Sequence, residues 1–247
     1  MGTARVAVIG GGRSGAAIAA AIERAGGSPV LLSPSRGFDV TRDDVESAIG
    51  DAIAVVEATG RFTTSRRRAS AFFTASTKAV SDATNRTGAR HVLLSIAQCT
   101  RPDVQGYGYF AGKTAQETLA RSTSRHLRIV RSTQWFEFTE QNLERMRSGP
   151  IALVPGMLIQ PVALDSVADV IAAAALDADH APVDEVAGPD TTTLWSMTRR
   201  LGGHRPWPLP LPIPGRLGSA FRGGALLPGP DAVVQGPSFA EWLANRA

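Results

Sequence analysis

A glycine-rich turn between a short apolar segment and an alanine-rich segment constrains the fold of this chain more than any other feature. Residues 5–9 (RVAVI) are typical of a buried β-strand, and residues 16–25 (AAIAAAIERA) are typical of a helix. Between them, Gly10, Gly12 and Gly15 form the pattern G-x-G-x-x-G. In a strand–turn–helix unit, such glycines permit a tight turn, the approach of a pyrophosphate to the backbone, and close packing of the helix on the strand.

Further apolar segments follow at spacings that indicate alternating strands and helices. We expect strands at 29–32, 54–56, 91–95, 127–130, 151–154 and 184–187, and helices at 43–49, 66–87, 109–122, 136–146, 164–176, 193–201 and 238–245. This alternation predicts crossover connections and a parallel sheet with helices on both faces. The expected fold class is therefore α/β, a Rossmann-type doubly wound parallel sheet with a small C-terminal substrate-binding region.

The sequence predicts one domain rather than two. We expect a single NAD(P)-binding Rossmann-type domain over residues 1–247, with residues 151–247 supplying most of the substrate-side region. Seven prolines between residues 206 and 230 predict an irregular segment that packs over the rest of the chain.

Composition excludes several classes of protein. Of the 247 residues, 43% are hydrophobic and 19% charged, which is typical of a globular core. The single cysteine excludes an intramolecular disulfide framework, and the four histidines are too scattered for a zinc site, so we expect no metal. Apolar runs are too short for a membrane span or a signal peptide, which favours a cytoplasmic protein. Although the net charge is +4, the basic residues are dispersed and lack an aromatic binding motif, so we expect no nucleic-acid partner.

The end of the second expected strand indicates which dinucleotide binds. An NAD site usually places Asp or Glu there, whereas this chain has Ser33, Ser35 and Arg36. Arg36, and Arg13 from the glycine turn, can pair with a 2′-phosphate. We therefore favour NADP(H) over NAD, with Ser14 also lining the cofactor. The alternative is that these are ordinary loop residues of an arginine-rich chain.

Tyr109 and Lys113 form the pattern Y-x-x-x-K in a chain with only two tyrosines. Residues four apart share one face of a helix. A nearby ammonium group is expected to lower the pKa of the tyrosine from near 10, so that the phenol can exchange a proton with a carbonyl or alcohol. Ser95 ends an expected strand at the sheet edge where open α/β folds bind ligands. Alternatively, Tyr109 is a half-buried helix residue and Lys113 a solvated one.

Residues 133–136 follow the strand expected at 127–130 and should emerge at the same edge of the sheet. We expect Thr133 to contact the cofactor, and Gln134, Trp135 and Phe136 to bind substrate. Thr133 and Gln134 are also suited to the carboxamide of nicotinamide. For the two aromatic residues, packing in the core is an equal alternative.

The glycine turn, Ser95, Tyr109 and Lys113, in this order, resemble the short-chain dehydrogenase/reductase superfamily. The finer resemblance is to its atypical, NmrA-like NAD(P)-binding branch, and it covers nearly the whole chain through residues 12–15 (GRSG), 39–41 (DVT), 58–60 (ATG), 94–97, 109–117, 129–136 and 187–189. The resemblance implies that Tyr109 is the proton donor, that Lys113 binds the nicotinamide ribose and lowers the pKa of the tyrosine, and that Ser95 orients the substrate. It also places Ala58, Thr59 and Gly60 at the cofactor.

Together these features predict an NADP(H)-dependent oxidoreductase. It would transfer hydride to or from a small, fairly apolar carbonyl, quinone or activated alkene. We expect a small-molecule substrate and no membrane partner, and a homodimer is possible. One alternative is a non-catalytic NADP(H) sensor that regulates a partner protein. Another is an enzyme like the sugar-nucleotide epimerases, which is less favoured because the chain is short for their extended substrate domain.

Overall fold

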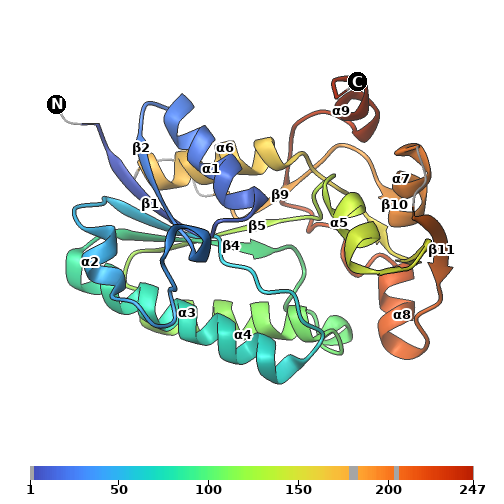
Figure 1. Ribbon diagram of the computed structural model, residues 1–247, viewed down its shortest axis with the longest axis horizontal. Coiled ribbons are helices and arrows are strands. Elements are labelled where there is room, and N and C mark those ends of the chain that lie inside the picture. The colour runs from blue at the N-terminus through green and yellow to red at the C-terminus, as the bar shows by residue number, and fades with distance from the viewer. Residues whose placement is uncertain (1–2, 178–182, 203–205, 247) are drawn as a thin grey trace.

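A seven-stranded parallel sheet forms the centre of the molecule (Figure 1). The computed structural model describes residues 3–177, 183–202 and 206–246. The strands lie in the order β12-β9-β5-β4-β3-β1-β2 and are all parallel to their neighbours. Their bounds are β1 (Arg5–Ile9), β2 (Ser28–Leu32), β3 (Ala54–Glu57), β4 (Arg90–Ile96), β5 (Leu127–Ser132), β9 (Glu185–Ala187) and β12 (Val233–Val234). The Rossmann-type α/β sheet predicted from the sequence is confirmed.

Helices cover both faces of the sheet, as Figure 1 shows. One face carries α1 (Arg13–Arg24) and α6 (Leu164–Leu176); the other carries α2 (Val45–Ile49), α3 (Arg66–Thr87) and α4 (Gly108–Thr123). None of the helices within the described ranges combines the length and the hydropathy that a bilayer crossing requires.

The strand β1 shows why these segments are apolar throughout. Val6 and Val8 pack with Ile18 of α1, whereas Ala7 and Ile9 pack in the core cluster on the other face of the sheet. Because successive side chains of a strand point to opposite faces, a strand covered on both sides needs apolar residues at every position.

The ends of the helices follow local signals in the sequence. The side chain of Ser65 accepts a hydrogen bond from the Arg68 N–H at the start of α3, and Gly88 ends this helix with φ of 79°. In contrast, α1 begins after Gly12 and has no side-chain cap. Its first N–H groups therefore lack a side-chain partner at the turn where the sequence predicts a phosphate.

The C-terminal elements gather beyond the carboxyl ends of the sheet strands (Figure 1). They form a three-stranded sheet in the order β11-β7-β6 and a two-stranded sheet of β10 and β8. The smaller elements of the chain are η1 (Pro34–Arg36), η2 (Pro102–Val104), α5 (Phe138–Arg145), β6 (Arg147–Ser148), β7 (Ile151–Pro155), β8 (Leu158–Ile159), β10 (Thr192–Thr193), α7 (Leu194–Arg200), β11 (Trp207–Leu211), α8 (Gly215–Arg222) and α9 (Phe239–Ala244).

The expectation that the proline-rich segment 206–230 is irregular is wrong. It contains the edge strand β11 and the helix α8. The N–H of Trp207 donates to Pro150 O at 2.7 Å, so alternate residues of β11 face β7 with their N–H groups. Pro208 and Pro210 occupy the intervening positions, where an edge strand needs no donor toward its neighbour.

Candidate functional site

The glycine turn has the close contacts that its sequence pattern predicts. Gly10 has φ of +137°, and a Cβ built on it would lie 2.5 Å from Ala58 O. A Cβ on Gly15 would lie 1.7 Å from Gly10 O, so only glycine allows α1 to pack this closely. A Cβ on Gly12, however, would have no atom of the described residues within 4 Å. Gly12 therefore borders open space at the N-terminus of α1.

The loop after β2 lies directly against this turn. A Cβ on Gly11 would lie 2.5 Å from Ser33 Oγ, and Ser33 Oγ lies 3.0 Å from Ser35 Oγ. Ser33 is buried, whereas Ser35 and Arg36 are exposed on η1. The glycine turn and the residues expected to select the dinucleotide thus form one surface.

Asp39, the first acid after β2, accepts hydrogen bonds from a residue of its own turn. Asp39 Oδ1 accepts hydrogen bonds from the Thr41 N–H at 2.9 Å and from the Thr41 hydroxyl at 2.7 Å. These bonds lower the pKa of the Asp39 carboxyl. An ionised carboxylate that is already hydrogen-bonded in this way is less available to a ribose hydroxyl.

Arg13 is held by carboxylates of α5. Its Nη1 lies 3.3 Å from Glu140 Oε2 and its Nη2 lies 3.8 Å from Glu144 Oε1. Ser14 is buried in the first turn of α1. No carboxylate in the described ranges forms an ion pair with Arg36, which leaves Arg36 as the better candidate for a phosphate.

Tyr109 lies in the first turn of α4 and faces the loop after β3. Its ring packs edge-on against Phe73 of α3, with centroids 5.4 Å apart. A Cβ built on Gly60 would lie 3.4 Å from the Tyr109 hydroxyl. Of the three residues expected at the cofactor after β3, Gly60 therefore lies beside the phenol. Ala58 contacts Gly10 instead, and Thr59 is buried.

Lys113 points into the interior of the molecule. Its Nζ donates to Leu94 O at 2.7 Å and to Gln116 Oε1 at 2.5 Å, and lies 5.0 Å from the centre of the Phe73 ring. Because these contacts occupy the ammonium group, Lys113 is a buried residue of the α4 packing rather than a solvated one.

The expectation that Lys113 lowers the pKa of Tyr109 is wrong in this structure. Burial raises the pKa of Tyr109 to about 12, and the nearby charge that opposes the rise is Arg145. Burial also lowers the pKa of Lys113, against the charges of Glu57, Cys99 and Glu117. The spacing of four residues placed both side chains on one helix face, but the ammonium turns to β4 and Gln116.

Ser95, near the end of β4, is buried in a cluster of polar side chains. Its Oγ lies 3.8 Å from Cys99 Sγ, and the Cys99 thiol donates to Glu117 Oε1 at 3.6 Å. Glu117 in turn forms an ion pair with Arg131, with contacts of 2.9 and 2.5 Å. Within the described part of the chain, the structure does not join Ser95 to Tyr109 by a hydrogen bond.

A buried carboxylate that the sequence did not reveal lies behind Lys113. Glu57 ends β3 and is fully buried. It accepts hydrogen bonds from Ser76 Oγ at 2.6 Å, Thr77 Oγ1 at 2.9 Å and Gln116 Nε2 at 2.9 Å, and it lies 3.1 Å from His91 Nε2. The available signal was an acid at the end of an apolar strand, AVVE.

Replacement of Glu57 is expected to destabilise the protein strongly. Glu57→Ala leaves buried donors without an acceptor and should cost about 3–5 kcal/mol of unfolding free energy. Although burial alone would raise the pKa of Glu57, hydrogen bonds and the charge of His91 lower it below the ordinary 4.5. The ionised group thus adds stability above about pH 4.5 that is lost as the pH falls through the folded-state pKa. Urea unfolding near pH 7 and pH 4 measures both effects.

The exposed Glu46 provides the control for this prediction. It pairs with Arg86 at the surface, so Glu46→Gln should change stability by less than about 1 kcal/mol. Equal losses in Glu57→Ala and Glu46→Gln would show that the buried network does not stabilise the fold.

Two side chains after β5 carry buried polar atoms without a partner. In the described ranges, Thr133 Oγ1 and both amide atoms of Gln134 are buried and lack a hydrogen bond. Their backbone is nevertheless fixed, because the Thr133 N–H donates to Val186 O at 3.0 Å and Gln134 O accepts from the Val162 N–H at 2.9 Å. Since buried polar groups are nearly always paired, these atoms can accept or donate a hydrogen bond that the described residues do not provide.

The aromatic residues that follow pack in the core. Phe136 is 1% exposed and contacts the rings of Phe239 and Trp242, both at 5.3 Å between centroids. Trp135 donates from Nε1 to Ser132 Oγ at 2.9 Å and packs against the core between the sheet and α6. Core packing is therefore the alternative that the structure supports for both rings.

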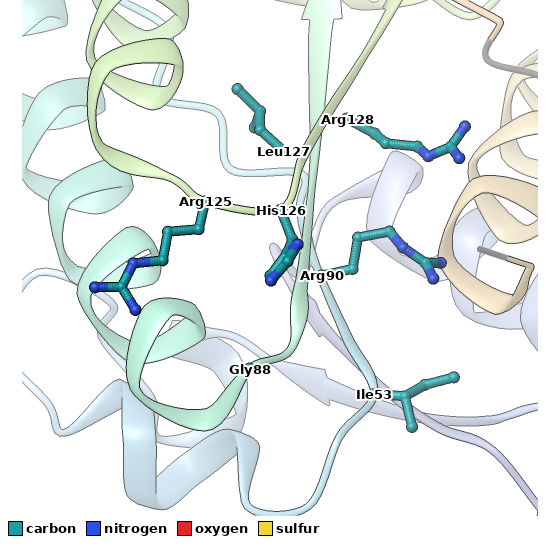
Figure 2. A pocket seen from close by; sticks show the side chains of 7 residues that line it. All are labelled: Ile53, Gly88, Arg90, Arg125, His126, Leu127 and Arg128. Carbon is teal, nitrogen blue, oxygen red and sulfur yellow. The ribbon is translucent and has the colours of Figure 1, made fainter. Parts of the chain in front are cut away.

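A cavity of about 380 Å³ lies at the opposite end of the sheet (Figure 2). In Figure 2, Arg90 and Arg128 point to one side, whereas Arg125 points to the opposite side, so the basic groups do not converge. Arg90 Nη1 also donates to Ala174 O at 2.9 Å and to Ala175 O at 3.0 Å, at the end of α6. This cavity lies at the amino ends of the strands and is separate from the glycine turn.

The parallel sheet and the glycine turn define a Rossmann-type fold, and solved structures with the same fold are known. The dTDP-4-dehydrorhamnose reductase of Bacillus anthracis, in complex with NADP, is similar with a TM-score of 0.71 and 14% identity, over 99% of this chain and 98% of that chain. The NADPH-dependent quinone oxidoreductase of Escherichia coli, in complex with NADPH, has a TM-score of 0.68 and 12% identity, over 98% and 99% of the two chains.

An epimerase shares the fold as well. The UDP-N-acetylglucosamine 4-epimerase of Bacillus cereus has a TM-score of 0.62 and 16% identity, over 96% of this chain and 86% of that chain. Neither a protein-family model nor a curated protein sequence matches this chain. At these identities the likenesses establish the fold alone.

Proposed function

We propose that this chain is an NADP(H)-dependent oxidoreductase of the short-chain dehydrogenase/reductase type, from its NmrA-like branch. It would transfer hydride to or from a small carbonyl, quinone or activated alkene. Support comes from the glycine turn and from two structures of the same fold that contain NADP or NADPH. The bound nicotinamide would supply or accept the hydride. The protein would bind and orient the cofactor and the substrate, and would exchange the proton.

The unpartnered atoms of Thr133 and Gln134 are the observation that carries this proposal. The side chain of Gln134 offers both a donor and an acceptor that find no partner in the described residues. A carboxamide offers the complementary acceptor and donor, so a nicotinamide carboxamide would satisfy both. The Thr133 hydroxyl offers a third hydrogen bond beside them.

The phosphate side of the site supports NADP(H) in particular. The open space at Gly12 and the uncapped N-terminus of α1 suit a diphosphate. Arg36 can pair with a 2′-phosphate, with the Ser33 and Ser35 hydroxyls beside it. Asp39, whose Oδ1 accepts two hydrogen bonds from Thr41, is less available as an acceptor for the ribose.

In this proposal Tyr109 donates the proton. Its pKa of about 12 keeps the phenol protonated at neutral pH, which is the form that can protonate a carbonyl oxygen during reduction. Lys113 and Ser95 act as positioning residues: both are buried, Lys113 holds α4 against β4 through Leu94 O, and Ser95 contacts Cys99 in the loop after β4.

Gln134→Met tests the cofactor assignment. Methionine fills a similar volume without polar atoms, so stability should stay within about 1 kcal/mol or rise. Loss of two hydrogen bonds should weaken NADPH binding by about tenfold or more, measured by the quenching of protein fluorescence. Gln160→Met is the control, since Gln160 Nε2 already donates to Gly188 O. Unchanged NADPH affinity in Gln134→Met would contradict the assignment.

A non-catalytic NADP(H) sensor is the second candidate, because Lys113 is turned inward and does not lower the pKa of Tyr109. It requires NADPH binding without oxidation over a panel of carbonyls and quinones. An epimerase-like enzyme is a third candidate, whose support is the fold that the chain shares with epimerases as well as with reductases.

A further inference from the structure

We propose that Arg145 selects substrates that carry an anionic group, such as a carboxylate. This inference rests on the proposed function and names the substrate class of that site. Arg145 is the last residue of α5, and its Cζ lies 4.8 Å from the centre of the Phe62 ring. Phe62 belongs to the loop after β3, two residues beyond Gly60, whose Cβ position lies 3.4 Å from the Tyr109 hydroxyl. The guanidinium therefore reaches from α5 to the loop beside the phenol.

Arg145 is a cation without an acidic partner among the residues that the structure describes. In the described ranges, no carboxylate forms an ion pair with this residue, although two acids lie on the same helix. Glu140 is bound by both Arg13 and Arg246, and Glu144 lies 3.8 Å from Arg13 Nη2. The acids of α5 are thus paired with Arg13 and Arg246, and none of them forms an ion pair with Arg145 in the described ranges.

The aromatic contact orients this charge. A guanidinium stacked on a ring keeps its N–H edge available, and that edge matches a planar carboxylate in a bidentate geometry. The charge also reaches both tyrosines, because Arg145 lowers the pKa of Tyr107 and Tyr109 against the effect of burial. It therefore acts on the region where the proton would be transferred.

The loop after β3 and the start of α4 supply aromatic and basic side chains on the same side of the molecule as the Arg145–Phe62 contact. Arg61, in the same loop as Phe62, lies 5.9 Å from the centre of the Phe72 ring. Tyr107 packs edge-on against Phe110 and Phe221 at the start of α4. Aromatic side chains beside a cation suit a small unsaturated carbonyl compound with one anionic substituent. This refines the fairly apolar substrate expected from the sequence.

A matched pair of probes tests the inference. The aldehyde 4-carboxybenzaldehyde carries an anion, and 4-formylbenzamide has nearly the same shape without charge. Calorimetric titrations of each into the protein, with and without saturating NADP⁺, should show about tenfold tighter binding of the carboxylate. Arg145→Gln should abolish this preference. Arg147→Gln is the control, because Arg147 is exposed and donates to Gly149 O of its own hairpin; it should keep the preference.

Equal affinities for the two probes, a preference that survives in Arg145→Gln, or no binding of either probe would overturn the role of Arg145. Oxidation of NADPH with each aldehyde separates this result from the proposed function. A carboxylate preference that depends on Arg145, without NADPH oxidation, would overturn the oxidoreductase and keep the anion site. Oxidation with equal kcat/KM for both aldehydes would overturn the anion site alone.

Discussion

Gly12→Asp is expected to weaken NADPH binding by at least about 100-fold while the fold stays as stable as before. The position has open space for a side chain, and Asp is a favourable residue before the first turn of a helix, so stability should change by only a few tenths of a kcal/mol. The new carboxylate would nevertheless occupy the place where a diphosphate approaches the backbone, and would repel it. Fluorescence titration with NADPH and thermal unfolding measure the two effects.

Gly12→Asn separates charge from size. Asn has nearly the same shape as Asp and caps the helix as well, but it is neutral. It should weaken NADPH binding less than Gly12→Asp does. If both variants bind NADPH as the unmodified protein does, the open space at Gly12 is not the diphosphate site.

Tyr109→Phe is expected to lower the rate of NADPH-dependent carbonyl reduction by about 10²–10⁴ and to leave NADPH affinity unchanged. Removal of the hydroxyl retains the edge-on packing of the ring against Phe73, so the fold should not change. Tyr107→Phe is the matched control, because Tyr107 is the other tyrosine of the chain and packs against Phe110 and Phe221. It should retain most of the activity.

The pH dependence of the reduction provides a second measurement on Tyr109. A proton donor must be protonated, so its contribution is lost as the pH rises through its pKa. With a pKa of about 12, Tyr109 should cause no decline in rate between about pH 7 and pH 9. A decline in that range that disappears in Tyr109→Phe would show that another group lowers the pKa of the phenol during the reaction.

The elements that could be predicted from the sequence are those with strong local signals. The helix at 66–87 has the predicted bounds, since a serine cap precedes it and a glycine with positive φ follows it. The strand at 5–9 also has the predicted bounds, because burial on both faces makes it continuously apolar. The turn between β1 and α1 was predictable down to the contacts of Gly10 and Gly15.

Elements that depend on distant partners could not be predicted in this way. The strand β11 exists because Trp207 finds Pro150 and β7, although its prolines suggested irregular structure. The two-residue strand β12 is too short to leave a periodic pattern, and it forms because β9 offers a free edge.

In the candidate site, too, local patterns predicted some features, whereas contacts between distant residues determine others. Helical spacing placed Tyr109 and Lys113 on one face, but the direction of the ammonium depends on Gln116 and on Leu94 O of β4. The carboxylate of Glu57, which accepts a hydrogen bond from Gln116, comes from a third element. Contacts of this kind arise from tertiary packing, and no local pattern in a single sequence encodes them.

The most direct test of this account is a titration of the purified protein with NADPH and with NADH, followed by fluorescence. Arg36 and the two serines of the loop after β2, with Asp39 bound to its own turn, predict a lower Kd for NADPH than for NADH. Tighter binding of NADH would contradict the NADP(H) assignment, and binding of neither nucleotide would contradict the proposed function itself.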